Sequence, residues 1–286
     1  MLLPMKDLLV RASKENYGVA APNVSTELDA RAVIEAAEEL HAPLILDVAY
    51  RATKDIKFFG SYLTRLAEKS NVPIAINLDH GFLYEHAIDA IAAGFTSVMV
   101  DRSSEPYEVN VRDVKEIVKV AHATGVSVEA ELGHVGDGAN YEVDGVTALT
   151  EPSMAKKYIE ETGVDCLAVA IGTAHGEYKG TPHIDFDRLV EIKKIVGPEY
   201  PLVLHGGSGS GDENLAKACK LGINKVNIFT DLMIAAKNSV ADVTNYRALW
   251  ATISGAIKDQ IGYYIKLFGG ENKAWIPENY GVKGNK

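Results

Sequence analysis

The chain has little of what marks a secreted, nucleic-acid-binding or membrane-spanning protein. Only two of its 286 residues are cysteines, Cys166 and Cys219, so the sequence indicates no disulfide framework and favours a reducing compartment. The formal net charge is −10 and no block of lysine or arginine occurs, which argues against a nucleic-acid partner. No apolar run is long enough to cross a membrane, and the N-terminus lacks a signal-peptide pattern. We therefore expect a cytoplasmic protein with neither a nucleic-acid nor a membrane partner.

What the sequence does have is a regular alternation of short apolar runs and amphipathic helical segments. Several of the helical segments end at a glycine, which suits a left-handed helix cap. Eight strand–helix units favour a parallel sheet closed into a (β/α)8 TIM barrel with extra C-terminal helices. An open doubly wound sheet would show a glycine-rich turn after its first strand, and this one ends Ala21-Pro22-Asn23. The eight runs cover residues 18–24, 44–48, 74–81, 97–101, 127–131, 167–174, 201–204 and 225–228.

The whole chain, residues 1–286, is assigned to one barrel domain. From Lys237 onward the spacing of apolar residues predicts helix, with isoleucines recurring at helical intervals. The last segment, about 271–286, is polar and contains proline and glycine, so we expect it to lie on the surface or to fray.

Three of the predicted strands end in a histidine: His80, His175 and His205. In a barrel the C-terminal ends of all strands meet on one face, which is where such folds carry their chemistry. Any one of these histidines alone is better explained as a hydrogen-bonded residue at a strand end. Three at matching positions are the ligand set of a catalytic zinc ion, which takes three protein ligands and keeps one position open.

Further polar residues stand at the same strand ends. Asp79 would point to the opposite side from His80 on an extended backbone, unless the strand end twists. The sequence leaves open whether Asp79 orients a histidine or acts as a general base. His134, in the loop after the fifth strand, has no assigned role. The complete set at strand ends is Asn23, Asp47, Asp79, His80, Asp101, Glu131, His175, His205, Ser208, Asn227, Thr230 and Asp231.

Two glycine- and hydroxyl-bearing segments follow the seventh and eighth strands, where barrels tend to bind a phosphate group. Their candidate phosphate-binding residues are Gly207, Ser208, Asn227 and Thr230. A tight turn with a helix cap explains Ser208 but not the occurrence of two such segments. Gly176 and Lys179, after the second histidine, could bring a cation to the same site, and a monovalent cation there is a second candidate cofactor beside Zn²⁺.

Taken together, five segments resemble the class II, zinc-dependent ketose-phosphate aldolases, the group that includes fructose- and tagatose-bisphosphate aldolases. They occur in the family's order and the resemblance covers nearly the whole chain. As a set they are specific, although any one alone is weak. They are Asn77-Leu78-Asp79-His80-Gly81, Glu129-Ala130-Glu131-Leu132-Gly133, residues 172–179, His205-Gly206-Gly207-Ser208-Gly209 and residues 226–231.

The resemblance implies an aldolase, a lyase that reversibly cleaves a ketose 1-phosphate or 1,6-bisphosphate to dihydroxyacetone phosphate and an aldehyde through a zinc-stabilised enediolate. It implies that the three histidines bind zinc and that Asp79 is the acid/base at the substrate C4 hydroxyl. It places Asp101 and Glu131 close to the metal, beside it or at a second metal. It also implies a homodimer or homotetramer. The residues that it assigns to the dihydroxyacetone-phosphate half are Gly176, Lys179, Gly207, Ser208, Asn227 and Thr230.

The sequence departs from the family in three places. The loop after Gly133 usually reads Gly-Gly followed by acidic residues, one of them the proton-transfer base, whereas here only Asp137 and Glu142 are candidates for that base. Many relatives have Gln-x-Ser at the end of the second strand, where this chain has Asp47-Val48-Ala49. Arg102 replaces a small residue, and Arg51 follows the second strand. One or both arginines could receive an anionic group at the far end of the substrate, and pairing with local carboxylates is the alternative.

Two other functions compete with the aldolase. A metal-dependent barrel hydrolase would use zinc-bound water as the nucleophile and gives no role to two phosphate-binding segments. A non-catalytic sugar-phosphate-binding relative would have lost the loop base and would be stabilised by its ligand without turnover.

Overall fold

The structure is a computed structural model that describes residues 1–140, 148–241 and 243–278. Eight parallel strands form one sheet, in the order β1-β8-β7-β6-β5-β4-β3-β2. The backbone N–H of Val24 donates to the carbonyl of Asp47, and Asn23 forms a bridge with the same residue, so the first two strands close the ring. The strands are β1 Val19–Pro22, β2 Leu44–Ala49, β3 Ile74–Gly81, β4 Ser97–Val100, β5 Ser127–Leu132, β6 Cys166–Val169, β7 Leu202–Leu204 and β8 Ile223–Ile228. The predicted (β/α)8 barrel is confirmed.

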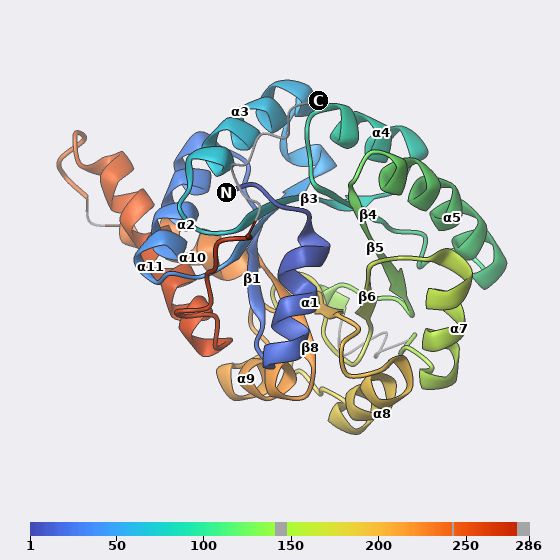
Figure 1. Ribbon diagram of the computed structural model, residues 1–286. Coiled ribbons are helices and arrows are strands. Elements are labelled where there is room, and N and C mark those ends of the chain that lie inside the picture. The colour runs from blue at the N-terminus through green and yellow to red at the C-terminus, as the bar shows by residue number, and fades with distance from the viewer. Residues whose placement is uncertain (141–147, 242, 279–286) are drawn as a thin grey trace.

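Helices surround the ring of strands (Figure 1). They are α1 Met5–Glu15, α2 Glu27–Glu39, α3 Ile56–Lys69, α4 Tyr84–Ala92, α5 Tyr107–Ala123, α7 Pro152–Thr162, α8 Phe186–Val196, α9 Asp212–Lys220, α10 Thr230–Ser239 and α11 Leu249–Leu267, with short 3-10 helices η1 Tyr50–Ala52 and η2 Gly138–Asn140. None of the helices described is long and apolar enough to cross a membrane. The helix predicted from Lys237 onward was wrong in its start, because α10 ends at Ser239 and α11 begins only at Leu249.

The residues of a strand alternate between two environments. Along β3, Ile74, Ile76 and Leu78 belong to the core that the strands share with the surrounding helices. The residues between them, such as Ala75 and Asn77, face the barrel interior. The opposite faces of each strand are therefore both buried, which explains why the runs read as almost continuously apolar.

Helix α1 closes the N-terminal end of the barrel (Figure 1). Its buried face carries Met5, Leu8, Leu9 and Ala12, which pack in one cluster with interior residues of several strands such as Val203. The chemistry is thereby confined to the opposite end, where the strands deliver their C-terminal residues.

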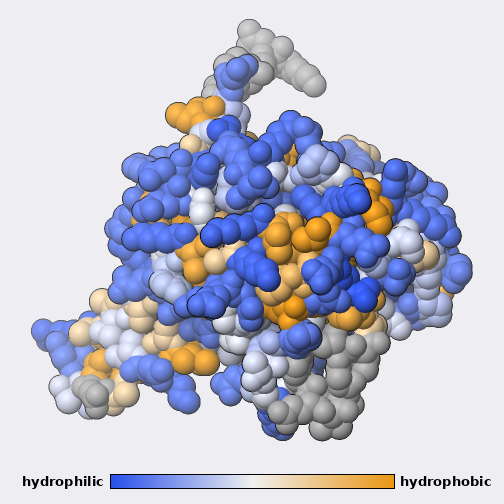
Figure 2. All heavy atoms as spheres, turned by 90° about the horizontal axis from the view of Figure 1, so that it is seen from below, coloured by the Kyte–Doolittle hydropathy of each residue, from blue (hydrophilic) through white to orange (hydrophobic). Residues whose placement is uncertain are grey.

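The segment after α11 is more ordered than its composition suggests. The N–H of Asn272 donates to the carbonyl of Leu40, and that of Ala274 to the carbonyl of His41. The guanidinium of Arg11 lies 4.7 Å from the ring centroid of Trp275. Of the two alternatives for this segment, the residues as far as Trp275 lie on the surface and are held to the barrel by these backbone hydrogen bonds and this aromatic contact. The surface seen in Figure 2 is mostly hydrophilic, with apolar side chains gathered near the centre of that face.

Candidate active site

The end of β3 departs from regular pairing with β4. The register skips from Leu78 to Gly81, so that Asp79 and His80 stand opposite a single residue, Met99. This is a β-bulge, and His80 has φ 50°, a left-handed conformation that residues other than glycine rarely adopt. The bulge breaks the alternation of side chains, so neighbouring residues both reach the site. This bulge is the local twist that the sequence analysis required for Asp79 and His80 to reach the same side of the strand.

The three predicted zinc ligands converge. The ring centroid of His80 lies 4.9 Å from that of His175 and 4.7 Å from that of His205. The ring centroids of His175 and His205 are 5.7 Å apart. One ligand nitrogen from each ring lies within 4.8 Å of the others. His80 Nε2 and His205 Nδ1 face each other at 3.0 Å. Nitrogens around a tetrahedral zinc ion stand about 3.3 Å apart, given Zn–N bonds of about 2.05 Å.

The other nitrogens of two of these rings are engaged by carboxylates. His80 Nδ1 lies 2.7 Å from Asp101 Oδ2, and His205 Nε2 lies 2.8 Å from Glu129 Oε1. Carboxylates accept, so these nitrogens carry the protons and the facing nitrogens keep their lone pairs. The buried Nε2 of His175 has no hydrogen-bond partner within the described ranges. With a nitrogen of His175 within 4.8 Å of these two nitrogens, the three rings fit the ligand set of a zinc ion.

The charges around the histidines also favour a cation. Burial lowers the pKa of His80, but Asp79, Asp101 and Glu131 outweigh it and raise that pKa to about 10. Burial and the neighbouring histidines lower the pKa of His175 to about 3, which keeps it a neutral ligand. Because a metal ion competes with the proton for the imidazole, the carboxylates that favour protonated His80 equally favour a metal cation there.

Asp101 and Glu131 lie beside the histidine cluster. With His80 they form a second group whose ligand atoms lie within 4.8 Å of one another. Burial, followed by Asp101, raises the pKa of Glu131 to about 8.

Asp101 also accepts from the hydroxyl of Ser103, which lies 2.9 Å from Nδ1 of His134. His134 is therefore connected to Asp101 through the hydroxyl of Ser103, a position that the sequence did not predict.

Asp79 lies between two asparagine side chains. Nδ2 of Asn23 donates to one carboxylate oxygen at 2.7 Å, and Nδ2 of Asn227 donates to the other at 3.0 Å. Burial alone would raise the pKa of Asp79, but His80, His205 and other charges lower it to about 2. The group is thus a carboxylate with both oxygens held in place.

Asp79 lines a cavity of about 570 Å³ at the C-terminal end of the barrel. Five of the six predicted phosphate residues line the same cavity. Lys179 does not, although it belongs to the loop after His175, where its backbone N–H donates to the carbonyl of Gly138. The lining residues that the sequence had selected are Asn23, Arg51, Asp79, His175, Gly176, Gly207, Ser208, Asn227 and Thr230.

The two phosphate segments and the second histidine loop are tied together. The hydroxyl oxygen of Ser208 accepts from the backbone N–H groups of Phe229 and Asp231, at the start of α10. The hydroxyl of Tyr178 accepts from the N–H of Ala174 at 2.7 Å and donates to the carbonyl of Gly206 at 3.1 Å. These bonds fix the loops next to two of the zinc-ligand candidates.

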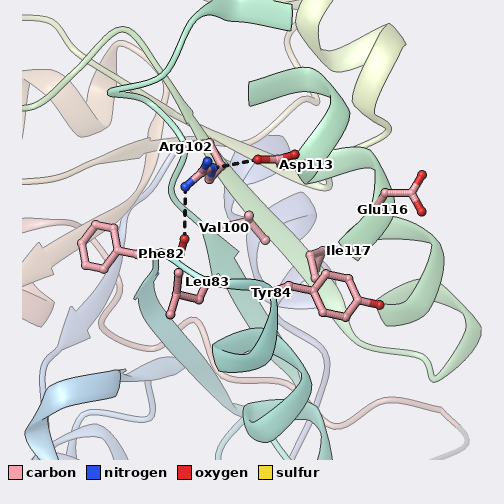
Figure 3. A pocket seen from close by; sticks show the side chains of 8 residues that line it. All are labelled: Phe82, Leu83, Tyr84, Val100, Arg102, Asp113, Glu116 and Ile117. Atoms are coloured by element: carbon pink, nitrogen blue, oxygen red, sulfur yellow. Dashed lines mark hydrogen bonds and ion pairs between the residues drawn. The ribbon is translucent and has the colours of Figure 1, made fainter. Parts of the chain in front are cut away.

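The structure separates the two arginines. Arg51 lies in η1, lines the cavity, and its guanidinium forms no hydrogen bond or ion pair within the described ranges. Arg102 lies in a different pocket, shown in Figure 3, where its Nε donates to Asp113 at 2.9 Å and an NH group donates to the carbonyl of Phe82. Pairing with a local carboxylate is therefore the outcome for Arg102 but not for Arg51.

Of the two candidates for the loop base, only Asp137 can be placed. Its segment pairs with His175 through a parallel bridge, and its carboxylate accepts from the N–H of Ala139. Glu142 lies outside the described residues.

Comparisons with known proteins identify the family of the chain. A family model described as class II fructose-bisphosphate aldolase matches residues 3–273. The chain belongs to this family. It is 40% identical to a fructose-bisphosphate aldolase from Thermus caldophilus, over 96% of this chain and all of that one. It is 38% identical to one from Staphylococcus aureus strain Mu50, over 96% and 99%.

A solved structure leads to the same family. The YdjI aldolase of Escherichia coli K12 superposes with a TM-score of 0.87 and 34% identity, over 96% of this chain and all of that one. The predicted family and enzyme class, a class II aldolase of the lyase type, are confirmed, and the hydrolase alternative loses its basis. The individual roles of the site residues stay predictions.

Proposed function

We propose that this class II aldolase is zinc-dependent and reversibly cleaves a ketose 1-phosphate or 1,6-bisphosphate to dihydroxyacetone phosphate and an aldehyde. The observation that carries the proposal is one cavity lined by Asp79, by a histidine of the ligand cluster and by both phosphate segments. The relatives from Thermus caldophilus and Staphylococcus aureus, which are named fructose-bisphosphate aldolases, support a bisphosphate substrate.

His80, His175 and His205 would hold the zinc ion. When bound, zinc would act as a Lewis acid that polarises the substrate ketone and stabilises the negative charge developing on its oxygen. Asp101 and Glu129 hold two of the rings in the orientation in which the free nitrogens converge.

Asp79 would take the proton from the C4 hydroxyl as the bond between C3 and C4 breaks, with the electron pair of that bond passing toward C3 and the carbonyl. In the reverse direction it would return the proton to the aldehyde oxygen. Both of its oxygens are already held by Asn23 and Asn227, so the carboxylate needs no reorientation when it reacts.

The phosphate of the dihydroxyacetone half would bind at the segments after β7 and β8. The hydroxyls of Ser208 and Thr230 and the glycine backbone line the cavity there, and α10 begins at Thr230 with its N–H groups at that end. Lys179 and a monovalent cation near Gly176 would add positive charge from the neighbouring loop.

Arg51 would receive an anionic group at the far end of the substrate, since it is the cationic side chain among the residues that line the cavity. Arg51→Ala should raise KM for substrates with a distal phosphate or carboxylate about tenfold or more and leave neutral-ended ketose 1-phosphates unchanged. Arg102→Ala is the matched control, because its guanidinium is paired with Asp113 outside the cavity. Equal losses for charged and neutral substrates would contradict the assignment.

The deciding experiment is a coupled assay of dihydroxyacetone-phosphate release over a panel of ketose 1-phosphates and bisphosphates. The assay is repeated after chelation, after zinc is restored, and with and without a monovalent cation. Zinc-dependent release from one member is expected and names its substrate. Bound zinc with ligand-dependent stabilisation and no release from any member would favour the non-catalytic relative.

We also propose a cytoplasmic homodimer or homotetramer. Exposed aromatic residues at the start of α11 and just before it, Tyr246 and Trp250, support an association between copies. Light scattering of the purified chain tests it, and a monomer at micromolar concentration would refute it.

A further inference from the structure

A lysine lies inside the barrel beneath the histidine cluster. The side chain of Lys225, on β8, is completely buried. Its Nζ lies 2.9 Å from an oxygen of Glu129 on β5 and 3.1 Å from an oxygen of Asp47 on β2, and both carboxylates are also completely buried. An ammonium group in such a place is unfavourable unless it is paired, and the proposed reaction gives it no contact with the substrate.

Glu129 connects this lysine to the metal site. Its Oε2 faces Lys225, and its Oε1 lies 2.8 Å from Nε2 of His205. A carboxylate with a partner on each oxygen cannot rotate without losing one of them. The imidazole it holds presents Nδ1 toward Nε2 of His80, at 3.0 Å. Lys225 thus stands two contacts from a zinc-ligand candidate.

Asp47 is a separate branch of the cluster. Its Oδ1 accepts from Nδ2 of Asn77 at 2.8 Å, and among the residues that the structure describes no hydrogen bond or ion pair joins Asp47 to a histidine. Glu129 is therefore the carboxylate that links Lys225 to a zinc-ligand candidate.

We propose that Lys225 is a positioning residue for the metal centre. Its ammonium holds Oε2 of Glu129 and so fixes the orientation of that carboxylate. Oε1 of Glu129 in turn accepts from Nε2 of His205, so that Nδ1 of His205 stays free for the metal. The inference rests on the proposed zinc site but not on the proposed reaction. A purely structural role, in which Lys225 only neutralises buried carboxylates, predicts an effect on stability and none on metal binding.

The test compares Lys225→Met, which keeps the length of the side chain without its charge, with Asp47→Asn as the matched control. Zinc affinity is measured by competition with a chelator, together with thermal unfolding and the visible spectrum after Co²⁺ substitution. Lys225→Met should weaken zinc binding about 10–100-fold and alter the Co²⁺ spectrum. Asp47→Asn should keep zinc affinity within about twofold, because the bond between Glu129 and His205 is untouched. Unchanged affinity and spectrum in Lys225→Met, with only a lower unfolding temperature, would overturn the proposal.

A double variant keeps the test decisive if Lys225→Met does not fold. Lys225→Met combined with Glu129→Gln removes both charges of this ion pair, and burial, which raises the pKa of Asp47, favours the neutral form of Asp47 once the ammonium is gone. The new amide oxygen can still accept from His205 but is no longer held by an ion pair. We expect weakened zinc binding in the folded double variant, and wild-type affinity would refute the positioning role. If the unmodified protein binds zinc but releases no dihydroxyacetone phosphate, the proposed reaction is contradicted. The positioning role of Lys225 is unaffected by that result, because it concerns zinc binding alone.

Discussion

The substitution Asp79→Asn separates the two halves of the proposed reaction. It keeps the size of the side chain and removes its capacity to take a proton. A positioned general acid or base contributes about 10²–10⁴-fold, so kcat for cleavage should fall by that factor, equivalent to about 3–5 kcal/mol. The direct cost in stability is smaller. One of the two bonds from Asn23 and Asn227 would be lost, because the new amide group is a donor facing a donor, at about 1–3 kcal/mol.

Two assays distinguish this role from a general loss of the site. Cleavage is followed by dihydroxyacetone-phosphate release, and the other half of the reaction by exchange of the C3 proton of dihydroxyacetone phosphate with solvent, observed by NMR. The exchange involves no C4 hydroxyl, so Asp79→Asn should retain most of it, and zinc content should match the wild type. Cleavage and exchange falling by the same factor, with zinc still bound, would show that Asp79 does not act at C4.

Three further outcomes follow from contacts in and around the barrel. Asp101→Ala removes the carboxylate 2.7 Å from His80 Nδ1 and should weaken zinc binding about 10–100-fold by chelator competition; unchanged binding would contradict its orienting role. Tyr178→Phe removes the hydroxyl that accepts from Ala174 and should lower kcat more than it raises KM, whereas an effect on KM alone would assign Tyr178 to substrate binding. Burial lowers the pKa of Lys193 to about 8, so between that pH and about 10.4 the folded chain binds fewer protons than the unfolded chain. The free energy of unfolding should therefore rise through this window relative to Lys193→Met, and parallel pH profiles in chemical denaturation would refute it.

Much of this site could be predicted from the sequence because its signals are local. His80, His175 and His205 each follow an apolar run directly, and a barrel necessarily gathers the ends of its strands on one face. The glycine and hydroxyl segments after the seventh and eighth strands are readable for the same reason. Family motifs then supplied the reaction, which periodicity alone does not contain.

Other features depend on partners distant in the sequence. The bulge at Asp79 and His80 exists because β3 and β4 pair with unequal numbers of residues, a property of two strands and not of one. Arg51 and Arg102 were equivalent candidates in the sequence. Only the folded structure shows that Arg102 is paired with Asp113, whereas Arg51 lines the cavity.

The buried lysine shows the same limit. In the sequence Lys225 is a single charged residue in an apolar strand, and the residues near it do not predict its ion-pair partners. Its partners, Asp47 and Glu129, come from strands on other parts of the ring and meet it only when the barrel closes. The sequence by itself determined which strands carry chemistry at their ends, because that depends on hydrophobic pattern. The tertiary structure alone decided which charges pair inside the barrel, because pairing energy depends on distance and burial across the closed sheet.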